Sequence, residues 1–181
     1  RLDNILAEFP KGNLQLICFT GSGGKKAVEL LGGVTINEII AQSTAVSALY
    51  PEVKTIIEMG GEDSKLIFMG NGRADGRSYL SDFAMNSLCA AGTGSFLDQQ
   101  GKRIGVKIDK EFGELALKSV NPPRIAGRCS VFAKSDMIHL QQVATPVHDI
   151  VAGLCFAVAR NFKRTLGKRK DLQSPLIFQG G

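Results

Sequence analysis

The chain has 181 residues, of which 44% are hydrophobic and 22% are charged, proportions typical of a globular protein with a core of its own. Its formal net charge is +5, and no stretch approaches the roughly 20 apolar residues of a membrane span. Residues Arg1 to Pro10 lack the apolar core of a signal peptide, so we expect a cytoplasmic, reducing location and no membrane partner.

In the first third of the chain, helices and short strands are expected to alternate. We predict a helix over 2–9, a strand over 14–20, a glycine turn over 20–24, and helices over 25–31 and 37–49. The last helix has apolar residues near helical spacing, and Pro51 ends it.

The remaining two thirds begin with strands and continue with helices. Strands are predicted over 53–59, 64–69 and 77–85, and Asn71-Gly72 is a hairpin signal, so these strands should form an antiparallel meander. Helices are predicted over 95–104, 112–118, 132–143 and 146–168, with a final strand over 176–178. This order predicts an α/β fold with an antiparallel hairpin attached.

Much of the basic excess lies near the end of the chain. It is carried by Arg160, Lys163, Arg164, Lys168, Arg169 and Lys170. No tryptophan and no run of aromatic residues lies among these cations, which argues against a nucleic-acid surface. We expect the solvated face of one helix, with an acidic partner protein as the alternative.

The turn after the strand over 53–59 has the composition of a phosphate-binding segment, Gly60-Gly61-Glu62-Asp63-Ser64-Lys65. Glycines let backbone N–H groups approach phosphate oxygens without a side chain in the way. A carboxylate just beyond them can hold Mg²⁺ through water, or orient an attacking water. The alternative, which this motif alone leaves open, is a tight hairpin with a solvated, charged tip.

Two other glycine segments are candidates for the same chemistry. Gly92-Thr93-Gly94 precedes a predicted helix, where free N–H groups and the helix dipole favour an anion. It matches neither a Walker loop nor a dinucleotide fingerprint, so a plain glycine-rich helix start is a rival interpretation. Gly180-Gly181 follows the final strand and is a third candidate, for phosphate or adenosine.

The four cysteines fall into two classes. Cys18 and Cys155 have apolar neighbours and are expected to be inert core residues. Cys89 and Cys129 each stand before a predicted helix among small or polar neighbours, a position that favours the thiolate. None of the four forms a C-x-x-C pair, so the sequence spells out no self-contained zinc or ferredoxin-type site.

The number of suitable cysteines constrains any cluster. A [4Fe–4S] cluster usually takes about four cysteines, whereas Cys89 and Cys129 are two. A two-fold dimer would supply the other pair, with the cluster on its axis. From the residues alone, two unrelated cysteines remain the alternative.

Three segments together resemble a known family. They are Ile56 to Lys65, then Met85-Asn86 with Cys89-Ala-Ala-Gly-Thr-Gly-Ser-Phe-Leu-Asp98, and Cys129-Ser-Val-Phe-Ala133. They resemble the activator component of 2-hydroxyacyl-CoA dehydratases, a family that includes the ATPase subunits of benzoyl-CoA reductase. The resemblance implies the actin, sugar-kinase and heat-shock-chaperone ATPase fold (ribonuclease-H-like), here incomplete. Residues 1–51 would be the remainder of an N-terminal subdomain, and residues 52–181 a second α/β subdomain truncated at the adenosine motif.

The resemblance also implies an activity and a set of site residues. The family members are homodimeric ATPases that pass a low-potential electron from a bridging [4Fe–4S] cluster to the dehydratase, and they receive it from a ferredoxin or flavodoxin. With the residue chemistry above, this assigns catalysis to Glu62 and Asp63 and the cluster to Cys89 and Cys129. ATP and Mg²⁺ contacts are expected from Gly60, Gly61, Ser64, Lys65, Gly92, Thr93, Gly94, Gly180 and Gly181.

The sequence departs from the family pattern in three places. The first phosphate segment, Asp-x-Gly-Ser-Thr, is absent, and the adenosine motif stops after its two glycines. Glu62 stands where better-known activators carry glutamine. We therefore expect a piece of a longer protein. Two rival functions remain: a sugar or acetate-type kinase of the same fold, and a non-catalytic nucleotide-binding module.

Overall fold

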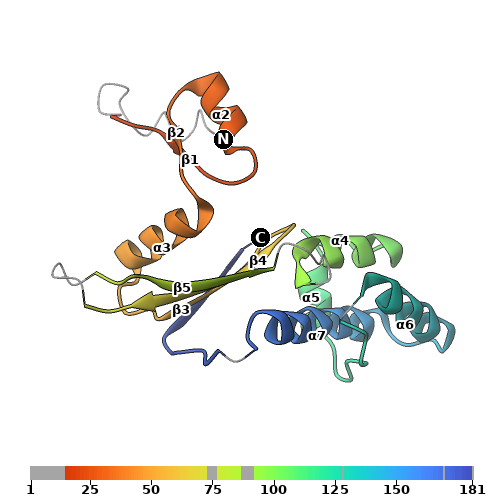
Figure 1. Ribbon diagram of the computed structural model, residues 1–181. Helices are drawn as coiled ribbons and strands as arrows, with labels where there is room; N and C mark the ends of the chain where they lie inside the picture. Colours follow the sequence, from red (N-terminus) through yellow and green to blue (C-terminus); the bar gives the residue numbers. More distant parts are fainter. Residues whose placement is uncertain (1–14, 73–76, 87–91, 128, 169, 181) are drawn as a thin grey trace. The chain divides into compact units, whose positions relative to one another are not determined.

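The computed structural model describes residues 15–72, 77–86, 92–127, 129–168 and 170–180 (Figure 1). The helix predicted over 2–9, Cys89 and Gly181 therefore lie outside the described residues. The chain divides into two compact units, one of Arg1–Pro51 with Asn71–Tyr79 and one of Glu52–Gly70 with Leu80–Gly181. No described helix is long and apolar enough to cross a membrane.

Within its described residues, the first unit contains two short parallel strands and two helices. Its elements are β1 (Cys18–Phe19), α2 (Gly24–Leu31), β2 (Val34–Thr35) and α3 (Glu38–Leu49). The helices predicted over 25–31 and 37–49 are confirmed. Asn37 caps α3 by accepting a hydrogen bond from the Ile39 amide at 2.9 Å. The strand predicted over 14–20 is wrong in length, because only Cys18 and Phe19 pair, with Val34 and Thr35 of β2.

The second unit is built on a four-stranded sheet in the order β5-β4-β3-β6. The strands are β3 (Thr55–Met59), β4 (Ser64–Gly70), β5 (Tyr79–Asn86) and β6 (Leu176–Gly180). β3 runs antiparallel to β4 and parallel to β6. The predicted order of three neighbouring strands is confirmed, whereas the parallel neighbour β6 comes from the far end of the chain.

Four helices complete this unit beside the sheet (Figure 1). They are α4 (Gly94–Arg103), α5 (Phe112–Leu117), α6 (Ser130–Gln142) and α7 (Val147–Thr165). All four were predicted, with ends that differ by a few residues. The start of α6 has the largest consequence, since the helix begins at Ser130 and places Cys129 at its N-cap.

α7 is the centre of the core. Its buried face packs with α4, α5 and α6 in a cluster that includes Phe96, Phe112, Met137 and Leu154. Further along α7, Phe162 packs with Leu66 of β4, which joins the helices to the sheet. One helix thereby holds both halves of the unit together by apolar burial.

Asp149, in the first turn of α7, ties this helix to the preceding loop. Its Oδ1 accepts hydrogen bonds from the Ser119 hydroxyl at 2.6 Å and from the amides of Val120 and Asn121 at 3.2 and 3.1 Å. The Ser119 hydroxyl, followed by these amides, lowers the pKa of the Asp149 carboxyl, because each donor favours its charged form.

This lowered pKa predicts a pH-dependent contribution to stability. The stabilisation is present above the unfolded-state pKa of about 3.9 and is lost as the pH falls through the lower folded-state pKa. We expect Asp149→Asn to reduce the difference in free energy of unfolding between neutral and acidic pH, measured by urea denaturation. The exposed Asp109 provides the control variant Asp109→Asn. An unchanged pH dependence in Asp149→Asn would contradict this account.

Candidate functional site

Three glycine segments meet at the carboxyl end of β3. The turn after β3 is closed by a 2.9 Å hydrogen bond from the Gly60 amide to the Asp63 carbonyl. The start of α4 lies against this turn, since the Gly94 amide donates to the Gly60 carbonyl at 2.9 Å. On the other side, Gly180 of β6 pairs with Met59 of β3. A turn, a helix start and a strand end, far apart in sequence, thus form one glycine-lined corner.

Close approach explains why glycine is needed at these positions. A Cβ at Gly94 would lie 3.3 Å from the Gly60 carbonyl oxygen, and one at Gly92 would lie 2.6 Å from Oδ1 of Asn161. Gly180 has a φ of +129°, and a Cβ there would lie 2.1 Å from the Met59 carbonyl oxygen. A side chain at Gly92 or Gly180 would force neighbouring atoms apart.

The amides at the start of α4 are already engaged by the turn. Besides the bond from Gly94, the Ser95 amide donates to the Gly61 carbonyl at 2.8 Å, and the Ser95 hydroxyl donates to the same oxygen. The Gly94 and Ser95 amides are therefore not free, unlike the N–H groups that the sequence interpretation supposed. The geometry shows α4 positioning the Gly60–Gly61 turn; the anion-binding role of Gly92, Thr93 and Gly94 stays a prediction.

Ser64 and Lys65 lie behind the turn rather than at its surface. The Ser64 hydroxyl is buried and donates to the Gly92 carbonyl at 2.5 Å. Lys65 is only 2% exposed, and its ammonium donates to Glu58 Oε2 at 3.0 Å and to Asp63 Oδ1 at 2.6 Å. The Lys65 ammonium therefore holds the Asp63 carboxylate in place from the buried side of the turn.

The solvent side of the turn carries the two predicted catalytic carboxylates. Gly61 and Glu62 are exposed, and Asp63 is half-buried. This side offers the exposed Glu62, the partly exposed Asp63 and a glycine-rich backbone, a combination that suits water-mediated contact with Mg²⁺ and close approach of a phosphate.

The described cysteines differ more than their sequence neighbours suggested. Cys129 is half-buried at the N-cap of α6, where its carbonyl accepts from the Ala133 amide at 3.1 Å. Cys155 is half-buried, and burial raises the pKa of its thiol, as expected for an unreactive residue. The prediction that Cys18 is a core residue is wrong, because it is exposed on a two-residue strand. Across the described parts of the chain, no three His, Cys, Asp or Glu residues lie close enough to hold a metal ion.

Glu58 was missed by the sequence interpretation, although a signal existed. A four-residue turn between antiparallel strands places Met59 opposite Ser64 and Glu58 opposite Lys65. Opposite charges facing each other across a strand pair are a stabilising combination. The strand register that follows from a four-residue turn therefore predicts the ion pair between Glu58 and Lys65.

The sequence matches known proteins along nearly its whole length. The profile of the BadF/BadG/BcrA/BcrD ATPase family matches residues 7–181. The chain is 40% identical, over 81% of its length, to a 2-hydroxyisocaproyl-CoA dehydratase activator of Clostridioides difficile, and covers 52% of that protein. It is 32% identical, over 97% of its length, to the (R)-2-hydroxyglutaryl-CoA dehydratase activating ATPase of Acidaminococcus fermentans, and covers 64% of it.

Solved structures agree with the sequence matches. Component A of the (R)-2-hydroxyglutaryl-CoA dehydratase of Acidaminococcus fermentans superposes with a TM-score of 0.86 at 31% identity, over 99% of this chain and 65% of that one. The activator of the Clostridium difficile 2-hydroxyisocaproyl-CoA dehydratase, with bound ADPNP, gives 0.83 at 31% identity, with the same two coverages. The chain thus spans between half and two thirds of these relatives.

These matches confirm two predictions from the sequence, the fold class and the family resemblance. The described part of the chain has the α/β fold of these two activator structures. The chain belongs to the BadF/BadG/BcrA/BcrD ATPase family.

Proposed function

We propose that the full-length protein is an ATP-dependent activator that delivers a low-potential electron to a 2-hydroxyacyl-CoA dehydratase or a related CoA-ester reductase. The observation that carries the proposal is the glycine-lined corner at the end of β3, where the Gly60–Gly61 turn, the start of α4 and Gly180 meet. The 40% identity to a dehydratase activator supports the choice of partner. In this proposal residues 1–51 are the remainder of an N-terminal subdomain, and residues 52–181 supply half of the nucleotide site.

The residues of the corner have distinct roles in the proposed ATP hydrolysis. Gly60 and Gly61 would let the phosphates approach the backbone closely. Glu62 would orient the attacking water, and Asp63 would hold Mg²⁺ through water. Lys65 fixes the Asp63 carboxylate through the 2.6 Å ion pair. Gly92, Thr93 and Gly94 would border the phosphates from the start of α4, and Gly180 with Gly181 would contact the adenosine.

Cys129 fits the role of a cluster ligand in its position and exposure. It is half-buried at a helix N-cap with no capping hydrogen bond from its side chain, and a helix N-terminus favours a bound group of net negative charge. One described cysteine cannot hold a [4Fe–4S] cluster, so we propose that Cys89 and Cys129 of two copies of the chain supply the four ligands. Such a cluster would carry one electron, accepted from a ferredoxin or flavodoxin.

The proposal predicts that iron binding and ATP hydrolysis can be lost separately. In the full-length protein, purified without oxygen, Cys129→Ser should lose the bound iron and retain ATP hydrolysis. Glu62→Ala should keep the iron and hydrolyse ATP about a hundredfold more slowly, the usual size of such a contribution. Iron and sulfide content and the steady-state hydrolysis rate are the measurements.

Matched variants separate these effects from general damage. Cys155→Ser removes a half-buried thiol of α7 and should keep the iron, and Glu52→Ala removes an exposed carboxylate and should hydrolyse ATP normally. Normal iron in Cys129→Ser would refute the cluster assignment. Absence of ATP hydrolysis in the unmodified full-length protein would refute the activator function itself.

A further inference from the structure

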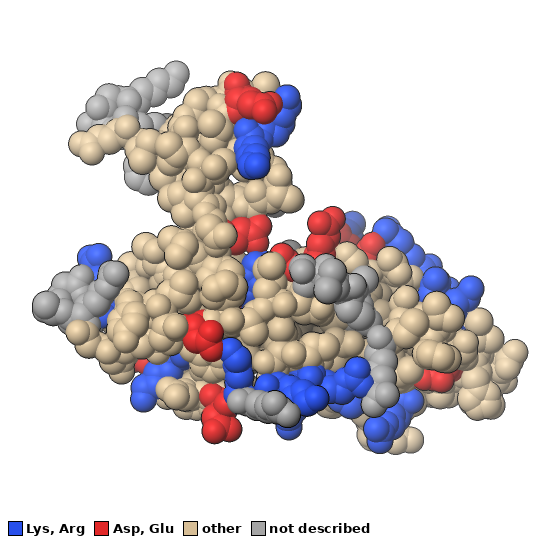
Figure 2. Space-filling model, viewed as in Figure 1, with Lys and Arg blue, Asp and Glu red and all other residues tan. Residues whose placement is uncertain are grey.

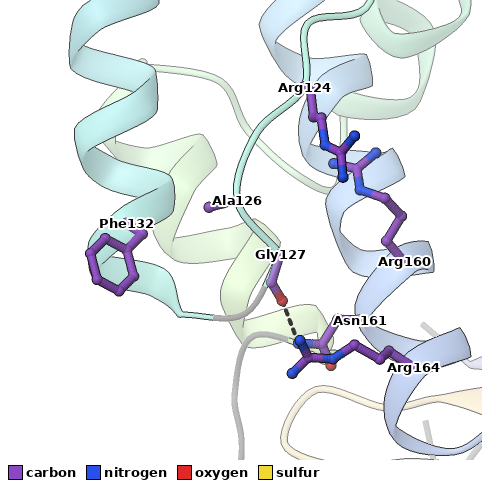
Figure 3. Close-up of a pocket in the computed structure, with 7 residues that line it drawn as sticks. All are labelled: Arg124, Ala126, Gly127, Phe132, Arg160, Asn161 and Arg164. Carbon is purple, nitrogen blue, oxygen red and sulfur yellow. Dashed lines mark hydrogen bonds between the residues drawn. The ribbon is translucent and has the colours of Figure 1, made fainter.

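A second candidate site lies apart from the glycine corner, in a cavity of about 510 Å³ between α6, α7 and the loop that precedes α6 (Figure 3). Its lining consists of Arg124, Ala126, Gly127, Phe132, Arg160, Asn161 and Arg164. Small-molecule sites commonly have volumes of about 300–1,000 Å³. The cavity is therefore large enough for a small ligand.

The arginines come from two segments but gather at one place. In Figure 3 the side chains of Arg124 and Arg160 point toward one another, and Arg164 extends over Asn161. Arg160 also donates to the Ile125 carbonyl at 2.7 Å, which fixes its guanidinium at the cavity wall. In Figure 2 the Lys and Arg side chains gather along the lower edge of the second unit, where α7 runs. The prediction of a solvated basic face is confirmed for Arg160, Lys163 and Arg164, which are exposed on α7. It is wrong for the cations after the helix: Lys168 is exposed beyond its end, and Lys170 is half-buried and forms an ion pair with Asp82. Arg169 lies outside the described residues.

This gathering of like charges has an energetic cost. Arg160 and Arg164 are four residues apart on α7, a spacing at which like charges repel. Within the described parts of the chain, no carboxylate lines the cavity or forms an ion pair with any of the three arginines. The nearby Asp136 accepts a hydrogen bond from the Ala126 amide at 2.7 Å. An anion bound in the cavity would relieve the repulsion.

Asn161 forms part of the cavity wall. It is 4% exposed, and its Nδ2 donates to the Gly127 carbonyl, which ties the loop that carries Gly127 to α7. Its Oδ1 is buried beside Gly92, so the arginine side chains are the polar groups that this wall offers to a ligand.

We propose that this cavity binds a phosphate monoester. The guanidinium groups of Arg124, Arg160 and Arg164 would hold the phosphate, for which their planar, forked donors are suited. The Phe132 side chain also lines the cavity and offers an apolar surface to the organic part of the ester. This binding does not depend on the glycine corner or on a cluster.

Calorimetric titration of the full-length protein with ribose 5-phosphate tests the site. We expect binding that weakens about tenfold or more in Arg164→Gln, and further in Arg160→Gln/Arg164→Gln, since each variant loses charge-assisted hydrogen bonds. Lys163→Gln is the matched control, because it removes the same charge from an exposed position on the same helix, outside this cavity, and should bind as the unmodified protein does. ATP hydrolysis should be unchanged in all three variants.

Several results would overturn the site. An equal loss of affinity in Lys163→Gln would show that net charge alone is responsible. Binding that survives in the double variant but disappears in Glu62→Ala would place the ligand at the glycine corner instead. Inorganic phosphate that binds as tightly as ribose 5-phosphate would show that the cavity recognises phosphate alone and would overturn the proposal of an ester. Because Arg164 makes no hydrogen bond to the main chain in the described structure, its single variant should fold even if Arg160→Gln does not.

Discussion

Replacement of Lys65 by methionine is expected to lower the free energy of unfolding by about 3–5 kcal/mol, the usual cost of removing one partner from a buried ion pair. The Lys65 side chain is 2% exposed, and its partners are Glu58 and Asp63. Glu58 is itself 7% exposed, so removal of the lysine would leave a largely buried carboxylate without this cationic partner. Urea denaturation at neutral pH measures the loss.

Two further variants make this prediction specific. Lys102→Met breaks the exposed pair with Asp98, whose side chains are 73% and 41% exposed, and should cost less than about 1 kcal/mol. Lys65→Met combined with Glu58→Leu should recover part of the loss, because an apolar pair can replace a buried ionic one. If Lys65→Met and Lys102→Met were equally mild, the buried ion pair would not hold the turn.

Gly127→Ala is the second substitution with a large expected effect. A Cβ at this position would lie 2.4 Å from the Ala157 carbonyl oxygen of α7, a contact that only a backbone shift can relieve. We expect a loss of about 1–3 kcal/mol or more in the free energy of unfolding, as for other overpacked cores. Gly127 stands two residues before Cys129, so the shift should also lower the iron content of the full-length protein.

Gly113 offers the matched control for this experiment. It lies in α5, and a Cβ there would meet no atom within 4 Å. Gly113→Ala should therefore raise the free energy of unfolding, by up to about 1 kcal/mol, because alanine is the better helix former. Opposite signs for the same glycine-to-alanine change would establish the close approach at Gly127. A neutral result there would contradict it.

The local structure could be predicted from local patterns. Local sequence patterns predicted α2, α3 and the four helices of the second unit, each within a few residues of its observed ends. Glycines and Asn71 marked the turns between β3, β4 and β5. Both signals depend on near neighbours in the chain, since a helix face and a turn are formed by residues a few positions apart.

Prediction was weaker where an element was very short. β1 and β2 have two residues each, too few for an alternating pattern to show. The apolar run around Cys18 was therefore assigned a longer, buried strand, and Cys18 itself is exposed. Such a short strand pair depends on backbone hydrogen bonds, so it leaves little pattern in the side chains of either segment.

The sequence by itself determined the composition of the candidate site, its glycines, its carboxylates and the two cysteines that precede helices, together with the family. Only the tertiary structure decided what each group touches. It turned the Gly94 and Ser95 amides toward the carbonyls of the turn, and placed the Lys65 ammonium between Glu58 and Asp63. It also brought Arg124 to Arg160 and Arg164 around one cavity. Contacts between residues far apart in the chain depend on how whole elements pack, and no local pattern records that packing.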